Sequence, residues 1–289
     1  WIFANTMGAR EAFAHRATEL AAEGRDADDE AVVRSFAEDV APGGALATYL
    51  SACRLAHRVG RTLFVHGAVT AESLGSVPGR ARLDDVDGWV AALNTFHAEQ
   101  LDAFAEQRVV DGVPGWSALV AYQAPLPGTL AHQGSVVYGR LADAHNDPRL
   151  PERSALARLR AAGIDRLVVG HTPVGDVPAV LRRDGFTLVM ADNSYGRLEH
   201  GTRLELDEHQ VAWWGRCRLD DGSELSVGAS VHDEPGAIGS VTAEGRLVKA
   251  RTPEGWLLFR ALPERRVEQV VVADPGPLAQ PSDVRHTDP

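Results

Sequence analysis

The segment Pro151–Pro173 reads PERSALARLRAAGIDRLVVGHTP. Its first part predicts a helix over Pro151–Ala162, because proline suits the first turn of a helix and Gly163 suits the position after its end. The apolar run Arg166–Val169 that follows is typical of a buried strand. A helix that leads into a hydrophobic strand is the alternation of an α/β sheet, so this segment predicts an α/β fold.

The rest of the chain places helices before strands. Thr62–Val65 is a second short apolar strand, whereas Ser135–Tyr138 fits either a strand or a helical turn. Periodicity and end signals predict helices over Glu11–Glu23, Asp28–Val40, Ala45–Val59, Asp84–Gln107 and Trp116–Tyr122. Turn residues separate predicted strands over Ala179–Arg182, Thr187–Ala191, Thr202–Leu206, Gln210–Arg218, Glu224–Gly228, Arg246–Arg251, Trp256–Ala261 and Arg266–Val272. This order predicts an α/β core with helical insertions and an antiparallel, β-rich C-terminal extension.

We expect three regions along the chain. Residues 1–200 form the core, and residues 201–273 form the extension that packs on it. Residues 274–289 are rich in proline and poor in large apolar side chains, which predicts a flexible tail.

Composition narrows the classes of function. The 289 residues carry 40 Asp and Glu against 29 Lys and Arg, a formal net charge of −11. Such an acidic chain is ill suited to the phosphate backbone of nucleic acids, so we expect no binding there. Two cysteines provide neither a disulfide framework nor a four-cysteine zinc site, which favours the cytoplasm. No apolar run approaches the ~18 residues of a transmembrane helix, so we expect no membrane contact.

Several enzyme classes lack their motifs. The sequence has no G-x-x-x-x-G-K-[ST], no G-x-G-x-x-G after a strand and no G-x-S-x-G, which argues against P-loop, dinucleotide-binding and serine-hydrolase enzymes. The chain opens on Trp1-Ile2-Phe3-Ala4 without a charged leader, so we expect no signal peptide.

Two histidines follow predicted strands directly. His66 comes after Thr62–Val65 and before Gly67, and His171 comes after a strand and Gly170. Ligands bind at the carboxyl ends of strands in α/β sheets, and neutral imidazole is a common metal ligand. Glycine beside each histidine allows a close backbone approach. Either histidine alone fits an ordinary turn, but the pair predicts a metal site if the two strands are neighbours.

Three blocks resemble those of calcineurin-like metallophosphoesterases in order and rough spacing. They are Leu63–Ala68 (LFVHGA), Val168–Val174 (VVGHTPV) and Ala191–Tyr195 (ADNSY). The likeness is closest to the phosphoprotein-phosphatase-like branch, because the later histidine block reads G-H-T-P. The resemblance covers about Leu63 to Tyr195 and implies a metallophosphoesterase-like α/β sandwich.

The resemblance also implies a metal centre. In that family two divalent metal ions lie ~3.5–4 Å apart and share a bridging hydroxide. His66, His171 and an upstream asparagine would bind the second ion, and Asn5 is the only upstream asparagine here. Ala4 and Thr6 depart from the family pattern around it, and Asn5 equally fits a helix cap or turn. Manganese, iron and zinc all suit such ligands.

Other residues would lie close to that centre by the same resemblance. Gly67, Gly170, Thr172 and Asp192 would be site-proximal, with Asp192 orienting His171. Asp192 also fits an Asx-turn that closes its strand. Arg10, Arg61 and Arg140 are candidates for phosphate binding by position alone, and each also fits a surface residue. No further catalytic residue is assigned.

The family's first two blocks, G-D-x-H-G and G-D-x-x-D-R-G, have no counterpart before Asn5. They carry the ligands of the first metal ion, so we expect this chain to be N-terminally truncated.

The expected activity is hydrolysis of phosphate monoesters through the bridging hydroxide. The substrate would be a phosphoprotein, a nucleotide or a small phosphate ester. One alternative is a degenerate, non-catalytic member that binds a partner or a phosphorylated ligand. Another is a single-metal hydrolase that uses His66, His171 and Asp192 as direct ligands.

Overall fold

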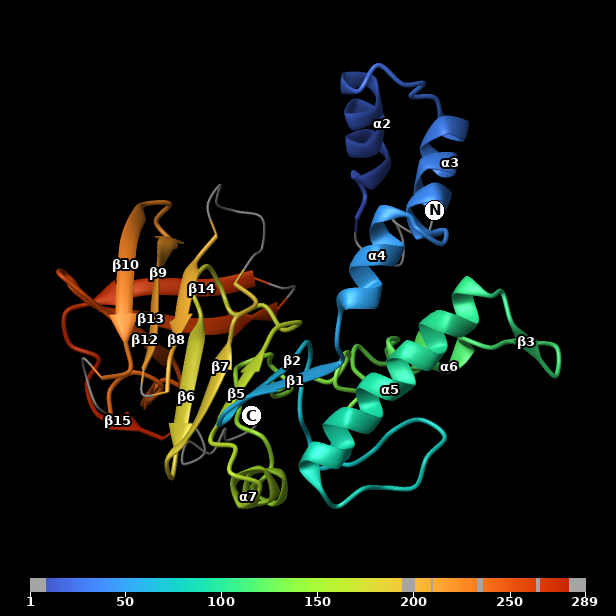
Figure 1. Ribbon diagram of the computed structural model, residues 1–289. Helices are drawn as coiled ribbons and strands as arrows, with labels where there is room; N and C mark the ends of the chain where they lie inside the picture. The colour runs from blue at the N-terminus through green and yellow to red at the C-terminus, as the bar shows by residue number, and fades with distance from the viewer. Residues whose placement is uncertain (1–8, 194–200, 209, 233–235, 264–265, 281–289) are drawn as a thin grey trace. The chain divides into compact units, whose positions relative to one another are not determined.

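A computed structural model describes residues 9–193, 201–208, 210–232, 236–263 and 266–280, and it shows a mixed α/β protein (Figure 1). The chain divides into two compact units. One comprises Trp1–Cys53 and Ala98–Trp116, and the other comprises Arg54–His97 and Ser117–Pro289. The core expected over residues 1–200 therefore spans both units. No helix among the described residues is long and apolar enough to cross a membrane.

The first unit is mainly helical. It contains α2 (Ala12–Ala22), α3 (Asp29–Val40), α4 (Ala45–Ala52), the last part of α5 (Val86–Ala105) and the hairpin of β3 (Val109–Val110) and β4 (Val113–Pro114). Asp28 caps α3, where its side chain accepts a hydrogen bond of 2.8 Å from the Ala31 amide. The rings of Phe13 and Phe36 lie 6.0 Å apart and join α2 to α3.

One predicted helix was too long. The helix expected over Ala45–Val59 ends at Ala52, and Ala56–Val59 forms the strand β1. β1 pairs with β2 (Thr62–Val65) in an antiparallel hairpin that turns at Gly60, where φ is +56°. Strand pairing outweighs the weak helical pattern of this segment.

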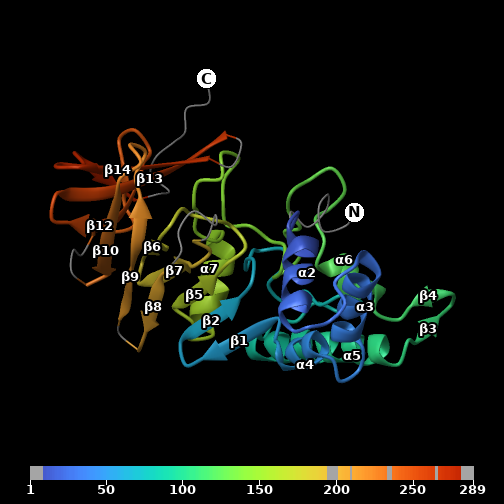
Figure 2. The ribbon, with the colours of Figure 1, turned by 90° about the horizontal axis from the view of Figure 1, so that it is seen from above.

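A five-stranded sheet organises the second unit. Its order is β1-β2-β5-β7-β6, with β5 at Arg166–Val169, β6 at Ala179–Arg183 and β7 at Phe186–Met190. β2, β5 and β7 are parallel neighbours, whereas the outer strands β1 and β6 are antiparallel to them (Figure 2). Because the three central strands run the same way, their carboxyl ends meet at one edge.

The helix and the strand expected over Pro151–Val169 are both present. α7 (Arg153–Ala161) leads into β5 and is followed by Gly163 with φ +75°. α6 (Ser117–Tyr122) matches the short helix expected near Trp116. Ser135–Tyr138, which fitted a strand or a helical turn, is neither a regular strand nor a helix and lies in a turn.

The C-terminal strands form two antiparallel sheets. The order of one is β10-β9-β8, with β8 at Arg203–Leu206, β9 at Val211–Arg218 and β10 at Glu224–Ser230. The order of the other is β14-β13-β12-β11-β15, with β11 at Val241–Thr242, β12 at Leu247–Thr252, β13 at Gly255–Leu262, β14 at Arg266–Val272 and β15 at Leu278–Ala279. β15 pairs with β11 inside the stretch expected to be a flexible tail, and residues 281–289 lie outside the described residues.

A shared core links these sheets to the central one. Trp213 is fully buried in one apolar cluster that also contains Val168 and Val189 of the central sheet and Ala250 and Leu257 of the C-terminal strands. Burying a large apolar side chain contributes roughly 1.5–3 kcal/mol. The β-rich extension therefore packs on the central sheet through apolar contacts.

Candidate functional site

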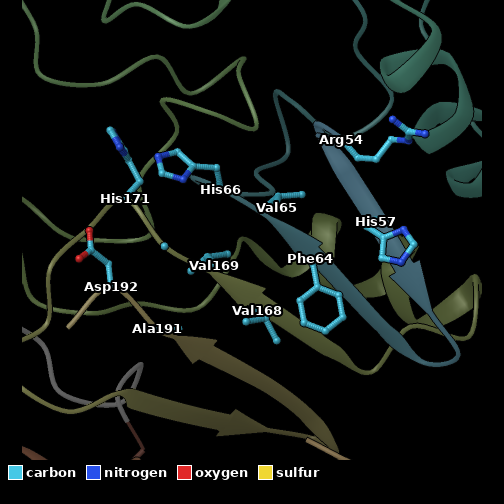
Figure 3. A pocket seen from close by; sticks show the side chains of 11 residues that line it. Arg54, His57, Phe64, Val65, His66, Val168, Val169, His171, Ala191 and Asp192 are labelled. Carbon is cyan, nitrogen blue, oxygen red and sulfur yellow. The ribbon is translucent and has the colours of Figure 1, made fainter. Parts of the chain in front are cut away.

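Three strand ends bring the predicted site residues to one edge of the central sheet. His66 follows β2, His171 lies just beyond β5 and Asp192 lies just beyond β7 (Figure 3). The ring centroids of His66 and His171 are 5.2 Å apart. The expected convergence of the two histidines is thus present in the fold, because their strands pair directly.

A pocket of about 510 Å³ contains this edge. Its apolar floor comes from β2 and β5, where Phe64 and Val168 are paired residues. Arg54 and His57 line the pocket on the side of β1 (Figure 3). Sequence reasoning missed these two residues, because β1 was expected to be part of a helix.

The turn after β2 depends on Gly67. Its amide donates a hydrogen bond of 2.7 Å to the Val136 carbonyl. A Cβ atom at this position would come within 2.4 Å of the Val137 carbonyl oxygen and 2.8 Å of that of Gly139. Only glycine allows the turn around Val136 to pack so closely against the strand end.

In the turn after β5, the histidine itself has the unusual backbone conformation. The Gly170 amide donates a hydrogen bond of 2.7 Å to the His66 carbonyl, which ties the two turns together. His171 has φ +61°, in the left-handed region, and the Thr172 amide bonds back to the Gly170 carbonyl at 2.7 Å. A left-handed residue other than glycine costs roughly 1–2 kcal/mol, and such residues persist only where their surroundings hold them.

The environment of His171 keeps its imidazole neutral. Burial, the Arg140 guanidinium and the neighbouring His66 together lower the pKa of His171 to about 4. Its Nε2 atom is buried and has no hydrogen-bond partner among the described residues, and the same holds for the Thr172 hydroxyl. A neutral imidazole with a free ring nitrogen is the form that binds a metal ion.

Tyr138 also contacts the His171 ring. The two ring centroids lie 4.4 Å apart with a tilt of 59°. The turn that carries Tyr138 is itself held by a hydrogen bond of 3.0 Å, which the Val136 amide donates to the Tyr122 hydroxyl. Sequence reasoning missed Tyr138, because nothing in the pattern of its segment points to the strand ends.

The histidine pair fits two ligands of one metal ion. With metal–nitrogen distances of ~2.0–2.1 Å at a tetrahedral centre, two imidazole centroids lie roughly 5 Å apart. The observed 5.2 Å and the unsatisfied Nε2 of His171 agree with this arrangement. Within the described parts of the chain, however, no three His, Cys, Asp or Glu side chains gather closely enough to hold an ion. The reading in which Asp192 is a third direct ligand therefore gains no support.

The remaining candidates divide clearly. Asn5 lies outside the described residues, as do Ser194 and Tyr195 of the third block. Thr172 is buried, and the Asp192 carbonyl accepts a hydrogen bond of 2.9 Å from Val174, which links the loops after β5 and β7.

The three arginines have different positions. Arg140 is close enough to His171 to influence its charge, and its Nε donates a hydrogen bond of 2.9 Å to the Leu130 carbonyl. Arg61 precedes β2 and pairs with Asp165, which precedes β5, so it lies at the opposite edge from His66. The length of β2 therefore separates Arg61 from His66, and this position gives phosphate binding by Arg61 at the site no support. Arg10 is exposed and belongs to the helical unit.

Comparison with known proteins adds no family. No protein-family model matches the chain, and neither curated proteins nor solved structures give a significant match.

Proposed function

We propose that this protein is a metal-dependent phosphoesterase that hydrolyses phosphate monoesters, with His66 and His171 as ligands of one divalent metal ion. The observation that carries the proposal is the pair of imidazoles 5.2 Å apart at the ends of two parallel strands. The resemblance of the three sequence blocks to calcineurin-like metallophosphoesterases supports the same reading. It would make the central sheet part of a metallophosphoesterase-like α/β sandwich.

The protein's own residues would prepare this site in three ways. The low pKa of His171 keeps its nitrogen lone pair available at neutral pH. Tyr138 and the Gly170–His66 hydrogen bond restrict the ring and backbone of His171. Arg140 supplies a positive charge beside His171, where a phosphate group would need one.

A divalent ion of manganese, iron or zinc bound there would polarise a phosphoryl oxygen and lower the pKa of a bound water toward neutrality. The proposal also includes a second such ion, a phosphorylated substrate and a cytoplasmic location.

A second candidate is a non-catalytic protein that binds a phosphorylated ligand. Two imidazoles alone hold a metal ion weakly, and the described residues bring no third acidic, histidine or cysteine ligand to them. Arg54, which lines the pocket, and Arg140, whose charge acts on His171, would attract an anion to this site.

Metal titration tests the proposal. The binding of Mn²⁺ and Zn²⁺ to the parent, His66→Ala and His171→Ala proteins is measured by isothermal titration calorimetry, with His145→Ala on an exposed loop as the matched control. We expect both site variants to lose at least about 100-fold in affinity, while His145→Ala binds like the parent. Equal binding by His66→Ala, His171→Ala and the parent would show that the site is misassigned.

Hydrolysis separates the two candidates. The release of p-nitrophenol from p-nitrophenyl phosphate is followed with increasing Mn²⁺. A metal-dependent rate that both histidine variants lose supports the phosphoesterase. Metal and phosphate binding without any turnover supports the non-catalytic candidate.

A further inference from the structure

A buried lysine lies behind the turn that carries His171. Lys249 of β12 is fully buried, and its Nζ donates hydrogen bonds to the backbone carbonyls of Val174, at 2.5 Å, and Val177. The ammonium also lies 4.8 Å from the ring centroid of Phe259. Removing an ammonium group from water is costly unless its donors are satisfied, so this placement requires a specific partner.

The partner is the loop between β5 and β6. This loop contains His171, and its residues Thr172, Val174, Asp176 and Val177 are all buried. The carbonyls that Lys249 contacts therefore belong to the same short segment as the candidate metal ligand. On its other side, the loop is tied to Asp192 through the amide of Val174.

The strand is irregular where Lys249 emerges. The register between β12 and β13 shifts between Val248 and Ala250, so Lys249 is the extra residue of a bulge. Bulges occur beside functional sites, where they redirect a side chain. Here the bulge directs Lys249 toward the loop instead of leaving it in the regular alternation of the strand.

Gln269 of β14 forms a second anchor on the same loop. Its side chain is fully buried, accepts a hydrogen bond of 3.1 Å from the Asp176 amide and donates one of 2.7 Å to the Asp176 carboxylate. The Arg218 amide donates to the same carboxylate at 3.0 Å. A Cβ atom on Gly175 would come within 2.3 Å of the Gln269 amide oxygen, so loop and anchor are in close contact.

From these contacts we infer that Lys249 and Gln269 are positioning residues for the candidate metal site. They hold the loop from one C-terminal sheet, so that His171 keeps its left-handed backbone and its ring stays beside His66. The β-rich extension then positions a metal ligand in addition to packing on the central sheet. This inference rests on the proposed function, because the positioning matters through the His66–His171 pair.

The central variant is Lys249→Ala, and its matched control is Val248→Ala. Both residues are fully buried and adjacent on β12, but Lys249 donates hydrogen bonds to the loop, whereas the backbone hydrogen bonds of Val248 are with Gly239 and Ser240. We expect Lys249→Ala to lower the affinity for Mn²⁺ by about ten- to a hundredfold, as loss of a group that orients a ligand does. Val248→Ala should lower the melting temperature without this loss of affinity. Equal losses of affinity in both variants would overturn the inference.

Chemical rescue sharpens the test. Propylammonium supplies the atoms that Lys249→Ala removes, so it should restore Mn²⁺ affinity in this variant and leave the parent unchanged. Propanol, which has similar shape but no charge, should not. Rescue of the melting temperature without rescue of affinity would mean that Lys249 has a structural role alone.

A metal-free measurement distinguishes failure of this inference from failure of the proposed function. The imidazole ¹⁵N chemical shifts of His171 should move in Lys249→Ala and stay near the parent values in Val248→Ala. If the parent binds no Mn²⁺, the proposed function fails while these shifts still test the positioning. If Lys249→Ala does not fold, Gln269→Leu provides the same comparison from the second anchor. Unmoved His171 shifts in a folded variant of either anchor contradict the inference.

Discussion

His66-Gly67 follows β2 and Gly170-His171 follows β5, so two neighbouring strands end in the same residue types in opposite order. In the first turn the histidine is exposed and the glycine is packed against the carbonyl groups of Val137 and Gly139. In the second the histidine is half-buried and has the left-handed backbone, whereas the glycine has more room.

The two turns differ in which residue is constrained. After β2 the constraint is steric and concerns Gly67, because a side chain there would clash. After β5 it is conformational and electrostatic and falls on the imidazole itself, which Tyr138 contacts and whose loop Lys249 holds. Substitutions at equivalent positions of the two turns should therefore have different effects on stability and on metal binding.

The largest expected effect is that of Gly67→Ala compared with Gly170→Ala. A Cβ atom at position 67 meets the Val137 carbonyl oxygen at 2.4 Å, whereas one at position 170 meets the His66 carbonyl oxygen at 3.2 Å. We expect Gly67→Ala to lose about 3 kcal/mol of unfolding free energy and Gly170→Ala less than about 1 kcal/mol. Urea denaturation measures both, and equal losses would contradict the steric contrast.

The next effect is a pH dependence that comes from His171. Burial, Arg140 and His66 lower its pKa from the ordinary 6.5 to about 4 in the folded state. Between these values the unfolded chain binds a proton at His171 that the folded chain does not. The free energy of unfolding is therefore unaffected by this group above pH 6.5 and decreases as the pH falls from 6.5 toward 4.

Compared with His171→Asn, the metal-free parent should lose on the order of 1–2 kcal/mol more stability over that range, since water around the half-buried ring screens part of the shift. Unfolding in urea with EDTA at pH 8 and pH 4.5 provides the measurement. The same stability difference between parent and variant at both values would argue against a neutral, buried imidazole.

A smaller effect is the difference in stability between the glycine and alanine variants, which should have opposite signs at His171 and His66. At position 171, glycine should be more stable than alanine by about 1 kcal/mol, because φ is +61° and alanine is strained there. At position 66 the backbone is outside the left-handed region, so alanine should be more stable than glycine by roughly 0.5–1 kcal/mol. The melting temperatures of the four variants test this, and the same sign at both positions would refute the backbone contrast.

The smallest effect concerns Tyr138. Its ring packs on His171, so Tyr138→Phe should leave the unfolding free energy within about 0.5 kcal/mol of the parent, whereas Tyr138→Leu should lose about 1 kcal/mol. Tyr138→Leu should also bind Mn²⁺ more weakly than Tyr138→Phe, because phenylalanine keeps the aromatic ring that packs on the imidazole and leucine does not. If phenylalanine and leucine behave alike in both assays, the ring contact has no role at the site.

Local sequence patterns were enough for most of the secondary structure. β5, β7, β9, β12, β13 and β14 lie within a residue or two of the predicted strands, because turn residues and apolar runs mark their ends. The histidine positions followed from the same logic, since each comes directly after an apolar strand. β1 was missed because its short sequence becomes a strand only by pairing with β2.

Only the tertiary structure determines which residues surround each histidine. The order β2-β5-β7 brings His66, His171 and Asp192 to one edge, and no local pattern specifies which strands are neighbours. Tyr138, Lys249 and Gln269 come from segments far away in the chain, and their roles arise from packing and desolvation. Sequence periodicity reports which face of an element is apolar, whereas the charge state of an imidazole and the support of its loop depend on whatever the fold packs against them.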